Sequence, residues 1–481
     1  MSRPTKSACL AAALAAVLAG CAVGPRYVKP VASAPAQAAF VSGSPTATAE
    51  TPLPVLWWRL YQDPVLDRLV ARALTENADL RVAAGNLAYA QGVLEEARAG
   101  RFPTTTLTAG GPTYGRSALQ VLNHVPASTG YAVGMTASYQ VDLFGRISRA
   151  IQAASANAEA IAAAEDVSRV TVAGQTASAY ANICGYGEQL DVARRSLALV
   201  RQTYDLTRAQ RDAGALSDFD VDREGVVLAQ ARAAIAPLEG QRRAALFSLA
   251  ALIGAEPSQV PPEAESCRSP PRLTQPLPVG DGASLLRRRP DLRAAERQLA
   301  AATARIGVAT ADLYPTITLG GSVNNAASTV SGLGATSGAT YSVGPGLSWT
   351  LPNILAARAR IHQAGGLASA ALAGFDGVVL RALKEAETAL AAYTAELDHH
   401  LALAEAQRSA DDALRLANIQ FQAGSVSFLD LITTEQTALA ADQALAQSDQ
   451  TISADQVAVF QALGGGWEDA LPVLAERLGK R

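Results

Sequence analysis

The sequence contains the same structural unit twice. The octet GALSDFDV at 214–221 returns as GSVSFLDL at 424–431, displaced by 210 residues, with Gly first and Asp seventh in both copies. Other matching positions keep this displacement, or one of 212 residues near the start: Tyr131 with Tyr341, Gly254 with Gly464, and Leu80 with Leu292. A repeat of this length indicates a duplicated supersecondary unit, and we expect the two-residue difference to fall in a loop.

Each repeat is predicted to contain the same elements in the same order. A helix (about 64–100 and about 284–312) leads to two short strands joined by a Gly/Ser/Thr-rich loop, and a very long helix, the Gly corner and a returning helix follow. The fold class is therefore mainly α with a small β part. The expected organisation is a signal peptide at 1–20, an N-terminal tether at 21–63, the first repeat at 64–254, an inter-repeat linker at 255–283, the second repeat at 284–466 and a C-terminal tail at 467–481.

The N-terminus has the features of a lipoprotein signal. Arg3 and Lys6 precede an apolar stretch of signal-peptide length, which ends in LAGC at 18–21. This tetrapeptide resembles the bacterial lipobox, so Cys21 is the predicted lipidation site. The alternative is a cleaved secretory signal with a coincidental Cys. In lipoproteins of this kind an Asp after the Cys favours inner-membrane retention, and Ala22 therefore favours the outer membrane.

Any membrane crossing must use strands, because no later segment has about 18 uninterrupted apolar residues. The four predicted strands have the length of tilted membrane strands, with one face for lipid and one for a lumen. The clearest alternation runs through Val133, Met135, Ala137, Tyr139 and Val141. Four strands leave an open sheet whose edges are unpaired in lipid, so several chains are needed to close a barrel.

The long helix of the first repeat is predicted from Arg146 to Asp212, a rod on the order of 100 Å without a Pro. Gly214 and Gly424 are the positions where we expect the chain to reverse. Apolar residues along this helix have the spacing of a coiled-coil seam, and the matching seam in the second repeat is weaker. The residues of the first seam are Ile183, Tyr186, Leu190, Ala193, Leu197, Val200 and Tyr204.

The sequence shows no pattern for enzymatic chemistry, so no catalytic residue, metal ligand or cofactor is predicted beyond the covalent lipid on Cys21. It has no phosphate-binding loop, nucleophile elbow or zinc-protease motif. The net charge of −3 leaves no basic footprint for nucleic acid. Cys184 and Cys267 could pair in an oxidising periplasm, and the sequence leaves the paired and unpaired alternatives open.

Seven segments in this order resemble the TolC-type outer membrane efflux proteins, and more closely their OprM/NodT-like lipoprotein branch. The resemblance covers nearly all of the chain after the signal, and with the duplication it is highly specific. The segments are CAVGPRYVKP from Cys21, LWWRLYQDPVLDRLVARALTENADLRVA from Leu56, VDLFGRI from Val141, DAGALSDFDV from Asp212, LAALIGAEP from Leu249, RRRPDLRAAERQLAAATARIGVATADLYPTITL from Arg287 and FQAGSVSFLDL from Phe421.

The resemblance implies a homotrimer. Three chains would form a twelve-stranded outer-membrane β-barrel, continued by a long periplasmic α-helical barrel, with the linker in an equatorial region. It also implies the exit duct of a tripartite efflux system. Drugs or other small toxic compounds would pass from an inner-membrane pump and a periplasmic adaptor to the outside, without nucleic acid as a partner.

The resemblance also assigns candidate sites to the two corners. The adaptor would dock on Gly214, Leu216, Ser217, Gly424, Val426 and Ser427, although these residues could merely cap helices. Candidates for a periplasmic gate are Asp220, Leu429, Asp430 and Thr433. Asp430 could equally be an acid favoured by the helix dipole in a first turn.

Three alternatives stay open. Glu435, Asp442 and Asp449 are seven apart and could line the lumen as an acidic stripe or form a solvated outer face. The same architecture could serve as a type I secretion exit channel for proteins. The chain could also be a lipid-anchored coiled-coil scaffold with no pore, in which case its alternating segments would lie outside the membrane.

Overall fold

The computed structural model describes residues 22–44, 48–49, 51–115, 122, 124, 128–273, 275–350 and 354–466. The predicted signal peptide, Cys21 and the predicted C-terminal tail lie outside the described residues. The longer helices are α2 (Pro64–Glu76), α3 (Ala78–Ala99), α5 (Arg146–Asp212), α6 (Asp218–Ala233), α7 (Ile235–Leu252), α9 (Gly282–Arg288), α10 (Pro290–Ala311), α11 (Ile354–Gln422) and α12 (Phe428–Ala462). The strands are β1 (Thr48–Ala49), β2 (Thr104–Gly115), β3 (Ser128–Val141), β4 (Leu277–Pro278), β5 (Thr316–Ala327) and β6 (Ala339–Ser348). Single turns of helix are η1 (Pro35–Gln37), η2 (Trp57–Tyr61), η3 (Pro257–Gln259), α8 (Pro262–Glu265), η4 (Val330–Gly332) and η5 (Thr336–Gly338).

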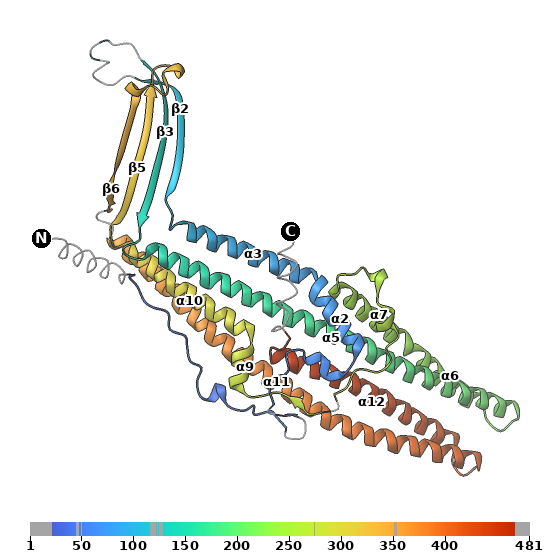
Figure 1. Ribbon diagram of the computed structural model, residues 1–481. Helices are drawn as coiled ribbons and strands as arrows, with labels where there is room; N and C mark the ends of the chain where they lie inside the picture. The colour runs from blue at the N-terminus through green and yellow to red at the C-terminus, as the bar shows by residue number, and fades with distance from the viewer. Residues whose placement is uncertain are drawn as a thin grey trace. The chain divides into compact units, whose positions relative to one another are not determined.

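The two repeats contain the same elements in the same order, which confirms the predicted duplication. The series α2, α3, β2, β3, α5 is followed by a returning segment, and α9, α10, β5, β6, α11 by another (Figure 1). The long helix predicted from Arg146 to Asp212 is α5. Every residue of its predicted coiled-coil seam is buried or half-buried.

The first helix predicted in each repeat is in fact two helices. In the first repeat Asn77 has an extended ψ, and its Oδ1 accepts a hydrogen bond from the backbone N–H of Asp79 at 2.8 Å. In the second repeat Arg289 is extended and Pro290 opens the next helix, because the residue before a proline is disfavoured in the helical region. Apolar periodicity continues through such a break, so the single-helix prediction is wrong at both places.

The chain packs as two compact units, and each unit takes segments from both repeats. Unit 1 comprises described residues of 1–30, 86–162 and 294–376, and unit 2 those of 31–85, 163–293 and 377–481. Unit 1 holds a four-stranded antiparallel sheet in the order β2-β3-β5-β6 (Figure 1). The sheet is therefore built from one hairpin of each repeat, joined through β3 and β5.

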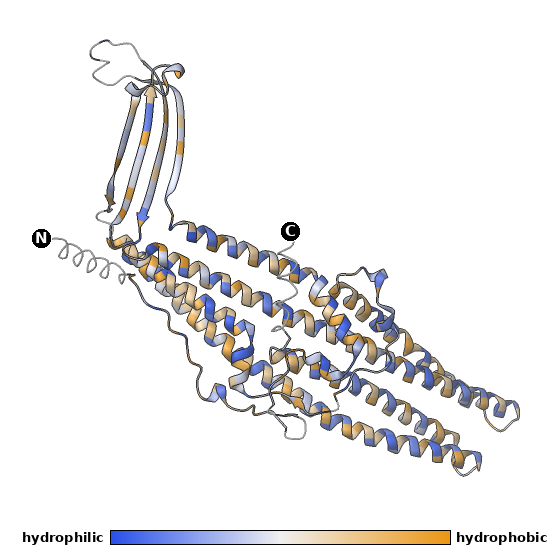
Figure 2. Ribbon diagram, in the orientation of Figure 1, coloured by the Kyte–Doolittle hydropathy of each residue, from blue (hydrophilic) through white to orange (hydrophobic). Residues whose placement is uncertain are grey.

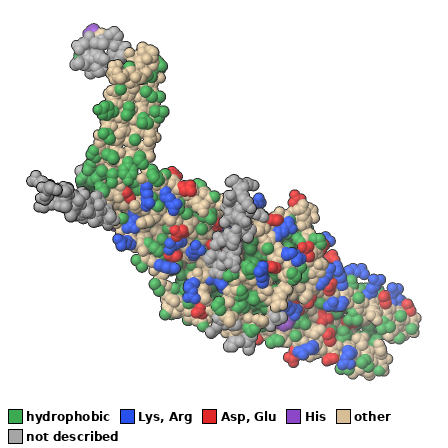
Figure 3. Space-filling model, in the orientation of Figure 1, with side chains coloured by type: hydrophobic (Ala, Val, Ile, Leu, Met, Phe, Trp, Pro, Cys, Tyr) green, Lys and Arg blue, Asp and Glu red, His purple; other side chains and the backbone are tan. Residues whose placement is uncertain are grey.

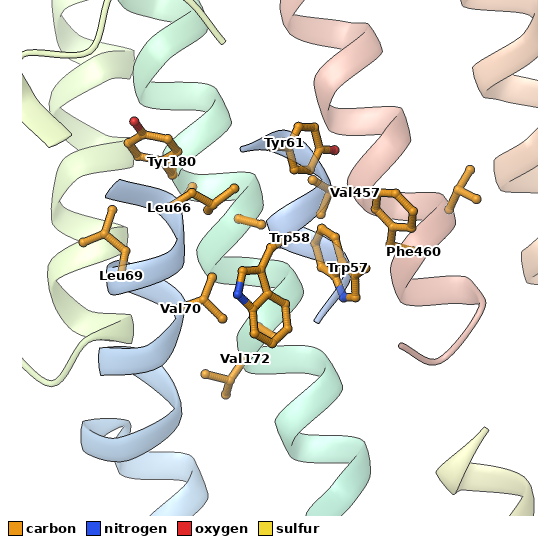
Figure 4. Close-up of a cluster of buried hydrophobic side chains, with 14 of the residues drawn as sticks. Trp57, Trp58, Tyr61, Leu66, Leu69, Val70, Val172, Tyr180, Val457 and Phe460 are labelled. Carbon is orange, nitrogen blue, oxygen red and sulfur yellow. The ribbon is translucent and has the colours of Figure 1, made fainter. Parts of the chain in front are cut away.

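Unit 2 has a large apolar core around the segment that precedes α2. Trp57 is fully buried and stacks on Phe460 of α12 with ring centroids 4.6 Å apart (Figure 4). Tyr61 meets the same Phe460 ring edge-on. Offset and edge-on aromatic pairs add stabilisation beyond the burial of their area. The core of unit 2 thus joins the tether region to the last helix of the second repeat.

One described helix, α11, passes a test of length and composition for a membrane-crossing helix. It holds an 18-residue window that is apolar on average, and 17% of that window is buried inside the chain. The sequence criterion of uninterrupted apolar residues excludes such windows, because they tolerate one or two charges. An apolar surface of this kind is available for packing against other helices.

Candidate functional site

The strands of unit 1 place their large apolar side chains on one face of the sheet. In an antiparallel sheet, directly opposed residues point to the same face. Met135 of β3 lies opposite Leu107 of β2 and Val323 of β5, and Val323 lies opposite Tyr341 of β6. The same face also receives Ala109, Tyr114, Val133, Tyr139, Val141, Ile317, Leu319, Val343, Pro345 and Leu347.

The opposite face is polar but uncharged. It carries Thr104, Thr106, Thr108, Thr136, Ser138, Gln140, Thr318, Ser322, Asn324, Thr340, Ser342 and Ser348, with Gly and Ala between them. None of the four strands contains a Lys, Arg, Asp or Glu. Figure 2 shows apolar bands recurring along the strands, and charged side chains are absent from the sheet in Figure 3. The predicted alternation is confirmed and extends to all four strands.

The sheet has two edges with unpaired backbone. Strands β2 and β6 each pair with one neighbour within the described chain. A strand edge presents a row of free N–H and C=O groups, which are especially costly in a hydrocarbon environment. Two uncharged edges thus require partners from other strands if the sheet lies in a membrane.

The two corners have the same backbone geometry. Gly214 and Gly424 adopt φ values of 76° and 71°, in the left-handed region that favours glycine. After Gly214, the N–H of Ala215 donates to the C=O of Gln210, and the N–H of Ser425 donates to that of Gln420 in the same way, both at 2.9 Å. This pattern is the Schellman motif, which ends a helix and turns the chain. The predicted reversal points are confirmed.

Each corner then starts its returning helix with a capping box. The hydroxyl of Ser217 accepts from the N–H of Asp220, and the carboxylate of Asp220 accepts from the N–H of Ser217 at 3.0 Å. Ser427 and Asp430 repeat the arrangement, with the second bond at 3.1 Å. The hydrogen bonds from these serines lower the pKa of Asp220 and that of Asp430. Asp430 therefore acts as a first-turn cap.

The remaining corner residues divide by exposure. Leu216 and Val426 are half-buried, while Leu429 and Thr433 are exposed and Leu429 is 45% accessible. The Thr433 hydroxyl donates to the C=O of Leu429 at 2.9 Å. Leu216 packs against a cluster that joins the two corners, made of Val200, Val227, Phe428, Leu431 and Ile432.

Residues 22–29 of the tether are fixed to unit 1 by specific contacts. The hydroxyl of Tyr27 donates to the carboxylate of Glu296, and the guanidinium of Arg297 lies 5.5 Å from the centre of the Tyr27 ring. Gly24 has φ 89°, and a Cβ there would meet the Cα of Gly307 at 2.5 Å, so only glycines allow this close approach. Sequence patterns alone did not single out these contacts, although the tether motif contains Tyr27.

The inter-repeat linker is attached to α5 by a disulfide. Cys184 of α5 and Cys267 of the linker are bonded, with Cα atoms 4.8 Å apart, which resolves the alternative that the sequence left open. Arg272 of the linker forms an ion pair with Asp449 of α12 at 2.5 Å. The linker thus contacts the long helix of the first repeat and the last helix of the second.

The acidic stripe considered for α12 does not form an exposed face. Glu435 and Asp449 are 3% and 7% exposed, because both point toward neighbouring helices of unit 2. Asp442 accepts a hydrogen bond from Gln407 of α11 at 3.0 Å. Seven-residue spacing identifies a common side of a helix but not which side is covered. Both the lumenal and the solvated interpretations are therefore wrong for Glu435 and Asp449.

Two further results concern bound groups and acids that the sequence did not reveal. No group of three or more His, Cys, Asp or Glu residues suitable for a metal ion occurs in the described part of the chain. Glu224 of α6 is 1% exposed, although nothing in its sequence context predicted burial.

Comparisons with known proteins agree with this geometry. The family model "Outer membrane efflux protein" matches residues 69–255 and 283–465. Nodulation protein T of Rhizobium leguminosarum bv. trifolii is 28% identical over 452 residues, which cover 94% of this chain and 96% of that protein. Outer membrane protein OprJ of Pseudomonas aeruginosa is 28% identical over 471 residues, which cover 97% of each chain.

A solved structure of the outer-membrane channel OprN has a TM-score of 0.86 and 33% identity, covering 93% of this chain and 100% of that chain. The structural neighbours are trimeric outer-membrane channels, and this chain is mostly helical with a small sheet part. The expected fold class, the resemblance and the outer-membrane localisation are thereby confirmed. This chain belongs to the outer membrane efflux protein family.

Proposed function

We propose that three copies of this chain form the exit duct of a tripartite efflux system. The duct passively conducts drugs or other small toxic compounds from an inner-membrane pump and a periplasmic adaptor to the outside, without enzymatic activity. The observation that carries the proposal is the sheet of unit 1. It has an apolar face, an uncharged polar face and two unpaired edges, as expected for one third of a barrel wall.

Closure by neighbouring copies follows from the edges. If β6 of one copy pairs with β2 of the next, three copies give twelve strands and no free edge. Each unsatisfied backbone group in hydrocarbon costs several kcal/mol, so closure has a strong driving force. The exposed apolar window of α11 supports the same assembly, because an adjacent copy can cover it.

The lipid on Cys21 is part of the proposal. The tether that follows it is fixed to unit 1 by the contacts of Tyr27 with Glu296 and Arg297. A single acyl chain gives only marginal membrane binding, whereas an acylated residue on a docked tether acts together with the barrel. We therefore assign the lipid a supporting role in outer-membrane anchoring.

The corners are the proposed docking sites for the adaptor. Gly214, Leu216, Ser217, Gly424, Val426 and Ser427 form two matching turns, and Phe219 beside them is 70% exposed. Exposed apolar side chains on a rigid turn suit a protein partner. The gate proposal concerns Asp220, Leu429, Asp430 and Thr433, because copies of Asp430 around a threefold axis would repel one another.

A matched pair of variants on β3 tests the channel. Met135 and Thr136 are adjacent, both exposed in the single chain, and point to opposite faces of the sheet. Met135→Arg places a charge toward lipid, at a cost of about 2–4 kcal/mol per chain near the midplane. We expect it to abolish assembly of the trimer in outer membranes. Thr136→Arg should assemble normally and shift the ion selectivity of the pore toward anions in planar bilayers.

The outcome separates the alternatives. A scaffold without a pore predicts that both variants behave like the unmodified protein and that none of them conducts. A type I secretion channel predicts the same bilayer results, so purification with cross-linked partners is needed as a second measurement. Recovery of an adaptor and a pump for small compounds would support efflux, and recovery of a protein-exporting ATPase would contradict it.

A further inference from the structure

Two buried carboxylates lie where the two returning helices meet α5. Glu224 of α6 is 1% exposed and Glu435 of α12 is 3% exposed. The hydroxyl of Thr203 on α5 donates to Oε2 of Glu435 at 3.1 Å. A Cβ on Gly225 would lie 3.7 Å from the ring of Tyr204 on α5, which shows how closely α6 packs there. Three helices thus enclose the pair.

Most of the carboxylate oxygens of this pair have no partner. Both oxygens of Glu224 and Oε1 of Glu435 are inaccessible to solvent and form no hydrogen bond within the described chain. Neither residue has an ion pair among the described residues. A buried ionised carboxylate without a partner is strongly unfavourable, and such a group takes up a proton instead.

Within the described chain, the immediate surroundings of the pair are apolar, and no basic side chain forms an ion pair with either carboxylate. The cluster beside the pair is apolar and includes Val227 of α6, with Leu414 and Phe421 of α11 packed against it. Along the neighbouring stretches, the other titratable side chains are Tyr204 and the exposed Arg201, Asp205 and Arg208 on α5, and Asp218, Asp220, Asp222 and Arg223 on α6. Those on the other two helices are Asp430 and Asp442 on α12 and the exposed Arg408, Asp411, Asp412 and Arg415 on α11. The charge that acts on Glu224 is that of Glu435.

Burial, with the nearby Glu435 charge as a second cause, raises the pKa of Glu224 to about 7. Burial also raises the pKa of Glu435, against a smaller lowering by the Thr203 hydrogen bond. Two interacting acids of this kind release their protons in separate steps that belong to the pair. Near neutral pH the pair therefore retains a proton that exposed glutamates have already lost.

We propose that Glu224 and Glu435 form a protonation-dependent lock that holds the two returning helices together against α5. While the pair keeps one proton, the enclosure holds a single negative charge. Release of that proton to water leaves two like charges in an apolar enclosure. The pair then separates and admits water, which loosens α6 from α12.

The effect of the lock on channel opening rests on the proposed function. If the helices of unit 2 bound the periplasmic end of a conduit, loosening them as pH rises should favour an open state. The lock itself is a property of the folded chain and can be measured without transport.

Infrared spectroscopy of the full-length protein in detergent tests the lock directly. We expect the C=O band of a buried carboxylic acid, which titrates with a midpoint near 7. Glu224→Gln and Glu435→Gln should each remove or strongly shift that titration, while Glu405→Gln, at an exposed glutamate of α11, should leave it unchanged. Absence of the band at about pH 6, or its survival in both buried variants, would overturn the proposal.

Hydrogen exchange and conductance measure whether loss of the proton loosens α6 from α12. Between about pH 5 and about pH 7, exchange in α6 and the first half of α12, corrected for the intrinsic rate, should accelerate by up to roughly tenfold per pH unit, and it should level off above about pH 7. The open probability in bilayers should rise in parallel, and Glu224→Gln should remove both responses. If no variant conducts, the channel proposal fails while the infrared titration still decides the lock. A normal titration with pH-independent exchange would contradict the loosening step.

Discussion

The two hairpins share a corner but differ in the helix that returns from it. In the first repeat α6 ends at Ala233 and α7 begins at Ile235, whereas in the second α12 continues unbroken to Ala462. Pro237 explains the difference, because it lacks the N–H that would donate to the C=O of Ala233. The corners agree because a glycine and a capping box define them locally.

The buried acids show the same divergence. The repeat counterpart of Glu224 is Thr434, and that of Glu435 is Gly225. Each repeat therefore supplies one acid at a position where the other repeat has none. Both repeats keep the glycine turn and its capping box, whereas the side-chain contacts along the adjoining helices differ between the two repeats. A conserved corner thus says little about how the adjoining helices pack.

The largest expected effect concerns the disulfide, which only the first long helix carries among the described residues. The counterpart of Cys184 in α11 is Thr394. Replacing Cys184 and Cys267 together by Ser should lower the free energy of unfolding by about 4 kcal/mol, since the crosslink closes a loop of 83 residues. Denaturant unfolding of the solubilised protein measures this, with Thr394→Ser as the neutral control. Equal midpoints for all three proteins would contradict the prediction.

A reciprocal proline exchange tests the difference between the returning helices. Gln447 occupies the position in α12 that Pro237 occupies in α7. Gln447→Pro should destabilise the protein by about 3 kcal/mol, because it breaks a continuous helix. Pro237→Gln at the existing break should change stability by less than about 1 kcal/mol. Thermal unfolding of the two variants measures both losses of stability. Equal losses would contradict the prediction, because they would mean that the existing helix break has no structural role.

The shared corner predicts equal effects in the two copies. Ser217→Ala and Ser427→Ala should each cost about 1 kcal/mol of local stability, the usual value for a helix N-cap. The rate of thermolysin cleavage near each corner reports this loss, and Ser248→Ala on α7 is a control outside any cap. If the two substitutions changed the cleavage rates by strongly unequal factors, helix–helix contacts beyond the corner, and not the local cap, would determine corner stability.

The smallest effect is a pH response of opposite sign to that of the buried pair. Serine hydrogen bonds lower the pKa of Asp220 and of Asp430, so their capping stabilisation is present above the ordinary aspartate pKa and is lost as pH falls through the lowered value. Hydrogen exchange at both corners should therefore accelerate on acidification, after correction for the intrinsic rate. Insensitivity of both corners down to about pH 3 would contradict the assignment.

Sequence reasoning succeeded where a local pattern dictates structure. The alternation of β3 predicted its two faces, and the glycines at 214 and 424 predicted the reversals. It failed where tertiary packing decides the outcome. Asn77 could be read as part of a helix until its side chain was seen to cap the next one. The burial of Glu435 depends on helices more than 200 residues away in the chain.

The neutral polar face of the sheet has a consequence for what such a passage can discriminate. Hydroxyl and amide groups such as those of Thr136, Ser322 and Asn324 hydrate cations and anions alike and impose no preference of sign. A conduit bounded by this face is hydrated and does not select its contents by charge. In the proposed duct, the choice of cargo would then be made upstream, before a molecule reaches the barrel.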